Sequence, residues 1–199
     1  MVNWILFDQA GVQNTLVFTH KENYTINQKR FPAKILQKIF YTEDFTKYSV
    51  GKLSEKELIG NFIKSENLEL RIDEFVELFK QGTVPIKGMY KLIDDLSRKY
   101  NLAALINEGA EWAEYKFQVT GLRSKFAYRI ISGEIGLKKP DHEFYEYALK
   151  KINVKPQDCI FIDDAKKNCI AAEELEIKSI DFKDVEQLKQ ELNRLNIHY

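Results

Sequence analysis

Polar side chains that could perform chemistry follow short apolar runs at several points of this chain. Asp8 ends the first run, and Lys139 lies in a Lys-Lys-Pro-Asp turn ahead of a helical stretch. The others directly follow later runs: Asn107, Glu108, Asp163 and Asp164. Carboxylates are preferred ligands of Mg²⁺, and a lysine ammonium attracts phosphate oxygens. Together these residues could hold a hard cation and a phosphate.

Each of these residues also has a simpler structural explanation. Asp164 could cap a helix that begins near Lys166, and Lys139 could be a solvated surface charge. In an open α/β sheet, however, ligands bind outside the carboxyl ends of the strands. Because the polar residues recur at successive strand ends, the pattern favours one shared site over separate structural roles.

The apolar runs themselves predict the strands of a buried parallel sheet. The run at 2–7 shows no polar alternation, which is typical of a strand covered on both faces. Similar runs lie at 102–106, 127–131, 159–162 and 179–182. Helical spacing of apolar residues fills most of the intervals, and alternating strands and helices indicate βαβ units. We therefore predict an α/β fold with a Rossmann-like, three-layer core built on a parallel sheet.

Residues 14–86 interrupt this alternation and contain no convincing strand. Ser54 begins a capping box ahead of one expected helix, and Asp73 could cap the next. We therefore predict two parts: a Rossmann-like core formed by residues 1–13 and 87–199, and a small helical cap domain at 14–86.

Composition excludes several classes of protein. The chain has 199 residues, of which 44% are hydrophobic, so it can form one domain with a small insertion. Thirty basic residues balance 30 acidic ones, which argues against a nucleic-acid partner. Cys159 and Cys169 provide neither a disulfide framework nor a cysteine zinc site. The chain has no long apolar run and no secretory leader, so we expect a cytoplasmic protein without a membrane partner. No pattern indicates an oligomeric state.

Three ordered segments resemble motifs of the haloacid dehalogenase superfamily of phosphohydrolases. The segment ILFDQAGVQNT resembles its first motif, an apolar strand followed by Asp-x-Asp-Gly. ISGEIGLKKPDHEFYEYAL resembles the family's Gly-x-x-Lys-Pro-Asp stretch, and IFIDDAKKNCIAA resembles its hydrophobic-Asp-Asp-x-x-x-Asn segment. The resemblance covers nearly the whole chain, and it implies the subgroup whose helical cap follows the first strand.

The resemblance implies that Asp8 is a nucleophile. It would attack the phosphorus of a small phosphorylated metabolite and form an aspartyl-phosphate that water later hydrolyses. Lys139 would pair with Asp8 and with the transferring phosphoryl oxygens. The expected function is thus that of a magnesium-dependent phosphatase.

The resemblance also implies a Mg²⁺ cofactor and its ligands. These are the Asp8 carboxylate, the backbone carbonyl of Ala10 and the Asp164 carboxylate, with Asp163 as a neighbouring or water-mediated ligand. Asn168 would steady the loop that carries the two aspartates.

Two positions depart from the family pattern. The residue two after the nucleophile is normally Asp, which protonates the leaving group and then activates water, but here it is Ala10. The second motif normally ends its strand with Ser or Thr, but the aligned residue is Ile106, which offers no donor. Asn107 beside it could bind the phosphate through its amide. An ordinary phosphomonoesterase activity is therefore expected to be impaired.

Three interpretations remain open at this point. The chain could be a hydrolase that retains activity on a small or activated phosphate ester. It could instead be a catalytically silent protein that binds metal, phosphate or a partner. The phosphonatase branch also carries Ala at this position and uses a cap lysine, for which Lys47 and Lys52 are candidates, to cleave a carbon–phosphorus bond. The last alternative is the least favoured, because such a lysine must be buried and this cap is lysine-rich.

Overall fold

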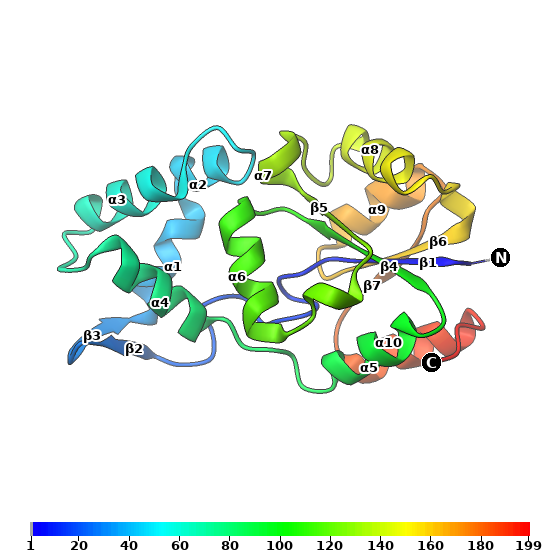
Figure 1. Ribbon diagram of the computed structural model, residues 1–199, viewed down its shortest axis with the longest axis horizontal. Helices are drawn as coiled ribbons and strands as arrows, with labels where there is room; N and C mark the ends of the chain where they lie inside the picture. Colours follow the sequence, from blue (N-terminus) through cyan, green and yellow to red (C-terminus); the bar gives the residue numbers. More distant parts are fainter. Residues whose placement is uncertain (1) are drawn as a thin grey trace.

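A five-stranded parallel sheet forms the centre of the computed structural model, which describes residues 2–199 (Figure 1). The strand order is β5-β4-β1-β6-β7, so the first strand lies in the middle. The strands are β1 (Trp4–Phe7), β4 (Asn101–Ile106), β5 (Tyr128–Ile131), β6 (Cys159–Asp163) and β7 (Lys178–Asp181). Ile5 pairs with Leu102 on one side and with Ile160 on the other. The carboxyl ends of β1, β4 and β6 therefore meet at one edge, and the predicted fold class is confirmed.

Helices cover both faces of this sheet. One face packs against α5 (Met89–Ser97), α6 (Ala110–Thr120) and α10 (Val185–Arg194), and the other packs against α8 (His142–Ile152) and α9 (Lys166–Glu174). Side chains alternate between the two faces along β1, because successive residues of a strand point in opposite directions. Ile5 and Phe7 join the first core and Leu6 joins the second. This explains why the strand is an unbroken apolar run.

The segment from residue 14 to residue 86 lies beside the carboxyl edge of the sheet (Figure 1). Its elements are β2 (Asn23–Ile26), β3 (Lys29–Pro32), α1 (Ala33–Gln37), α2 (Glu43–Tyr48), α3 (Glu55–Ser65) and α4 (Ile72–Gly82), with a 3₁₀ turn at Lys38–Tyr41. It packs around its own apolar cluster, which includes Phe18 and Phe75. Trp112 of α6 is fully buried in the same cluster, so the two parts share a continuous apolar contact.

Short elements complete the chain around the sheet. A four-residue helix α7 (Ser132–Ile135) follows β5, and 3₁₀ turns lie at Arg123–Lys125 and Pro156–Asp158.

The prediction of an insertion without strands is wrong. Strands β2 and β3 form an antiparallel hairpin in which Tyr24 pairs with Phe31. The two-residue loop between them holds Asn27 and Gln28 at positive φ, the backbone of a type I′ turn. Glycine usually marks such a turn in a sequence, and its absence here removed the local signal.

Two helix starts can be compared with their predicted caps. Ser54 caps α3 as expected: its hydroxyl accepts from the Glu57 amide, and the Glu57 carboxylate accepts from the Ser54 amide. The proposed Asp73 cap is wrong, because α4 begins at Ile72, two residues before the Glu74 start that an Asp73 cap implies. Asp73 instead pairs with the guanidinium of Arg71 on the surface.

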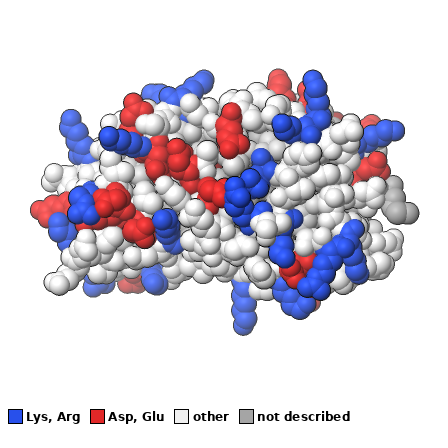
Figure 2. Space-filling view, viewed as in Figure 1, with Lys and Arg blue, Asp and Glu red and all other residues white. Residues whose placement is uncertain are grey.

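Charges of both signs are interleaved on the face of the molecule seen in Figure 2, without an extended field of one sign. This agrees with the equal numbers of acidic and basic residues. Among residues 2–199, none of the helices combines the length and the apolar character needed to span a membrane.

Candidate active site

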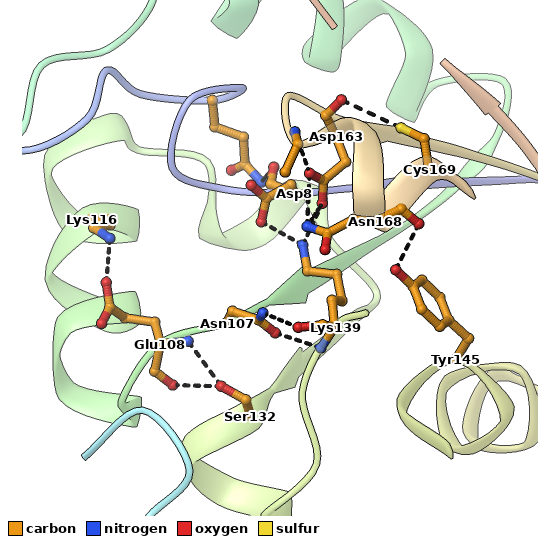
Figure 3. A network of polar contacts seen from close by, with 12 residues as sticks. Asp8, Asn107, Glu108, Lys116, Ser132, Lys139, Tyr145, Asp163, Asn168 and Cys169 are labelled. Atoms are coloured by element: carbon orange, nitrogen blue, oxygen red, sulfur yellow. Dashed lines mark hydrogen bonds and ion pairs between the residues drawn. The ribbon is translucent and has the colours of Figure 1, made fainter. Parts of the chain in front are cut away.

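A buried lysine joins two aspartates where β1 and β6 end (Figure 3). The Nζ atom of Lys139 donates to Asp8 Oδ1 at 2.7 Å and to Asp163 Oδ2 at 2.7 Å. The Lys139 side chain is only 1% exposed, and those of Asp8 and Asp163 are 12% and 0% exposed. Burial holds these side chains in one geometry, and salt and solvent weaken the attraction between their charges much less than they would at the surface.

The loop that carries Lys139 is fixed by the residue that follows β4. Asn107 accepts from the Lys139 amide through Oδ1 at 2.8 Å, and it donates through Nδ2 to the Lys139 carbonyl at 2.7 Å. The sequence suggested Asn107 as a phosphate-binding residue. Its amide group is instead engaged with the backbone of Lys139, which favours a positioning role.

Asp163 is held by hydrogen bonds to both carboxylate oxygens. Asn168 Nδ2 lies 3.0 Å from each oxygen, and the Ala165 amide donates to Oδ1 at 2.8 Å. The Tyr145 hydroxyl in turn donates to the Asn168 carbonyl at 2.8 Å. With Lys139 also bound, Asp163 has little acceptor capacity left, so its geometry suits the orientation of Lys139 better than direct coordination of a metal.

Electrostatics in this cluster are dominated by burial. Burial raises the pKa of Asp8 to about 7; the attraction of Lys139 opposes this rise, and the nearby Asp163 and Asp164 carboxylates add to it. Burial acts against the charge of Lys139, but the Asp8 and Asp163 carboxylates outweigh it and raise the Lys139 pKa. The pKa of Asp164 is raised by partial desolvation and by Asp163. Three carboxylates beside one ammonium leave an excess of negative charge that a cation would neutralise.

The donor set at this edge fits a hard divalent cation. Carboxylate oxygens of Asp8, Asp163 and Asp164 lie within 4.8 Å of one another. Lys139 occupies one oxygen of Asp8 and leaves the other available, and no hydrogen bond between described residues uses the Ala10 carbonyl. The uncommitted oxygens are thus those of Asp8, Ala10 and Asp164, and oxygen donors of this kind suit Mg²⁺.

Gly11 allows this arrangement. Its φ is +87°, and a Cβ atom built on it would lie 2.1 Å from Asp164 Oδ2. A side chain at this position would therefore be strained and would displace Asp164 from the site. The geometry of the site thus explains why the first motif of this chain has glycine at position 11.

The two departures from the family pattern occupy different surroundings. Ile106 is 2% exposed and belongs to the core on the α5 side of the sheet, so its side chain contributes no donor to the site. Ala10 lies on the wall of a cavity of about 350 Å³ between the sheet edge and the insertion. Most of the cavity wall contributed by the insertion is apolar: Leu16, Val17, Phe40, Tyr41 and Phe45.

The cavity also contacts a buried ion pair that the sequence reasoning did not identify. Lys116 of α6 donates to Glu108 Oε2 at 2.5 Å, and the two side chains are 2% and 4% exposed. A signal was present, because Lys116 follows Trp112 by four residues and therefore falls on the buried side of α6. Ser132 was also missed: its hydroxyl accepts from the Glu108 amide at 2.9 Å.

Comparisons with known proteins agree with this geometry. A family model described as haloacid dehalogenase-like hydrolase matches residues 5–182. Flavin mononucleotide hydrolase 1 of Arabidopsis thaliana is 26% identical over 84% of this chain and 68% of its own length. A phosphoglycolate phosphatase of Colwellia psychrerythraea is 26% identical over 74% of this chain and 71% of its own length.

A solved structure shares the fold. The enzyme bt-2542 from Bacteroides thetaiotaomicron, in complex with magnesium and inorganic phosphate, superposes with a TM-score of 0.73. It is 16% identical, and the match covers 93% of this chain and 96% of the enzyme. The long family match, the central parallel sheet and the lysine–aspartate cluster at its carboxyl edge lead to one conclusion: this chain belongs to the haloacid dehalogenase-like hydrolase family.

Proposed function

We propose that this protein is a magnesium-dependent phosphatase that acts on a small phosphate ester through a phosphorylated Asp8. The observation that carries the proposal is the Lys139 ammonium, which bridges Asp8 and Asp163 at 2.7 Å beside the uncommitted Asp164 carboxylate. This arrangement pairs a buried carboxylate nucleophile with cationic support for a phosphoryl group.

In the first step, an Asp8 carboxylate oxygen forms a bond to phosphorus while the bond from phosphorus to the leaving oxygen breaks. Lys139 holds Asp8 in place and offsets the charge of the phosphoryl oxygens. A Mg²⁺ ion held by Asp8, the Ala10 carbonyl and Asp164 would supply further neutralisation of that charge. The leaving group departs as an anion. Water then attacks the phosphorus atom of the phosphorylated Asp8, which releases inorganic phosphate, regenerates the carboxylate and frees a proton to solvent, from which the leaving-group anion takes up a proton.

Ala10 and Ile106 set the expected limits of this reaction. Ala10 cannot donate a proton to the leaving group, a contribution worth roughly 10²–10⁴ in rate. Ile106 lacks a donor for the phosphoryl group, which typically costs roughly 10²–10³. Leaving groups that depart without protonation avoid the first penalty. We therefore propose an enzyme that prefers activated esters.

The relatives support this class of reaction. Their names describe hydrolysis of flavin mononucleotide and of phosphoglycolate, both small phosphate esters. In the proposal, residues 14–86 act as a cap over the core formed by 1–13 and 87–199. The cavity between them would admit substrate and exclude water during the reaction.

The structure disfavours the phosphonatase alternative. The Lys47 side chain is 46% exposed and pairs with Glu43, and Lys52 is also exposed. Neither has the burial that a Schiff-base lysine requires. Catalytic silence remains the competing proposal, because it accounts directly for Ala10 and Ile106.

The test measures magnesium-dependent phosphate release from nitrophenyl phosphate. Wild-type turnover that is lost with EDTA and in Asp8→Asn supports the proposal, and Asp73→Asn, an exposed aspartate of α4, serves as the matched control. A wild type without turnover at any magnesium concentration favours the silent alternative.

A further inference from the structure

The buried Glu108–Lys116 pair has hydrogen-bonding capacity that the protein does not use. Lys116 donates only to Glu108 Oε2 among the described residues, and its ammonium lies 5.7 Å from the centre of the Phe79 ring. Glu108 Oε1 is buried without a partner in the part of the chain that the structure describes. A buried carboxylate oxygen without a donor is costly, and buried polar groups in folded proteins are normally satisfied.

Backbone hydrogen bonds hold Glu108 in place, independently of its ion pair with Lys116. Ser132 Oγ accepts from the Glu108 amide at 2.9 Å, and the Gly133 amide donates to the Glu108 carbonyl at 3.0 Å. Figure 3 shows the two charged side chains pointing toward one another from the β4–α6 loop and from α6. The pair thus comes from a helix and from a loop whose backbone is held by hydrogen bonds, an arrangement that suits a preorganised binding site.

Glu108 and Lys116 both line the 350 Å³ cavity that reaches Ala10. Tyr41 also lines this wall, but its side chain is largely exposed to solvent. The donors of two other polar side chains on the wall are already engaged. The Thr19 hydroxyl donates to the Leu16 carbonyl at 2.6 Å, and the Gln37 amide donates to the Phe18 carbonyl at 2.8 Å. Away from the exposed Tyr41 side chain, an occupant of the cavity would therefore meet an apolar wall with one donor and one acceptor side by side.

We infer that this pair recognises the leaving group of the substrate, and that this group is a flat apolar ring system whose edge carries an N–H beside a carbonyl. Lys116 donates to the carbonyl, and the unpartnered Glu108 Oε1 accepts from the N–H. The aromatic rings of Phe40 and Phe45, 5.3 Å apart, provide an apolar surface for the ring. A volume of 350 Å³ is within the range of small-molecule sites. Only the identification of the ring as a leaving group rests on the proposed phosphatase activity.

The test compares two ligands of the same outline. A hydroxyquinolinone has a lactam edge, and the corresponding methylnaphthol replaces that edge with C–H and methyl groups. Binding of both fluorescent compounds is measured by titration, without any need for turnover. We expect the wild type to bind the lactam about 10- to 100-fold more tightly, because a site built for hydrogen bonds rejects an analogue that leaves them unpaired.

The double variant Glu108→Leu/Lys116→Met removes both charges together and so leaves no unpaired buried ion. We expect it to lose the preference for the lactam. The control Glu43→Leu/Lys47→Met removes an exposed pair from α2 and should keep it. Equal affinities in the wild type, or a preference that survives in the double variant, would overturn the inference.

Phosphate release from the phosphate esters of the same two alcohols separates this inference from the proposed function. Lactam preference in binding without any turnover supports the recognition site and contradicts the phosphatase activity. Turnover of both esters at equal kcat/KM, with equal binding, supports the activity and contradicts the recognition site.

Discussion

Replacement of Asp8 by asparagine should stabilise the metal-free protein at neutral and alkaline pH. The pKa of Asp8 is about 7 in the folded protein, compared with an ordinary value of 3.8. Between these values the folded state holds one proton more than the unfolded state, so the free energy of unfolding of the wild type falls as pH rises. The introduced asparagine cannot ionise and is similar in shape to the protonated acid, so the variant escapes this loss.

The magnitude follows from the two pKa values. A difference of about 3 pH units, at 1.36 kcal/mol per unit, corresponds to about 4 kcal/mol. The free energy of unfolding of Asp8→Asn minus that of the wild type should therefore be near zero at pH 4. It should rise through the window from pH 4 to 7 and approach at most about 4 kcal/mol at pH 8.

Urea denaturation in EDTA at intervals between pH 4 and 8 measures this difference. Mg²⁺ at ten times its Kd should raise the free energy of unfolding of the wild type by about 1.4 kcal/mol. The increase should be smaller for the variant, which lacks one ligand charge. Asp94→Asn is a control of opposite sign, because Lys125 and Arg98 lower the pKa of Asp94. That variant should lose stability above the ordinary pKa of Asp. A difference for Asp8→Asn that stays flat or declines as pH rises would refute the reasoning.

Two further variants test the remaining features of the site. The double variant Ala10→Asp/Ile106→Ser restores the family pattern. It should raise kcat on poorly activated esters by roughly 10²-fold or more, measured by phosphate release. An unchanged or lower kcat contradicts the roles assigned to these positions. Gly11→Ala should weaken Mg²⁺ binding at least about tenfold in calorimetric titration, because its Cβ would lie 2.1 Å from Asp164 Oδ2. Gly136 also has a positive φ, but a Cβ atom there would meet no tertiary neighbour among the described residues within 4 Å. Equal losses of Mg²⁺ affinity in Gly11→Ala and Gly136→Ala would therefore count against a clash with Asp164.

The central sheet and the residues at its edge could be predicted from the sequence because they depend on local patterns. Unbroken apolar runs report burial on both faces, and in β1 the two cores do take alternate side chains. Because parallel strands end at one edge, Asp8 and Asp163 could be expected to meet there. The hairpin at Asn27 and Gln28 escaped prediction, because its turn uses positive φ at two residues other than glycine.

The roles of individual side chains were decided only by tertiary structure. Asn107 follows a strand, as a ligand residue would, but its amide meets the Lys139 backbone 32 residues away. The position of Lys116 on the buried side of α6 was a local property of its helix. Its place in a cavity required the insertion to pack over the sheet edge. Hydrogen-bond partners and cavities form only when folding brings distant segments together. The periodicity of apolar residues within one segment therefore cannot predict them.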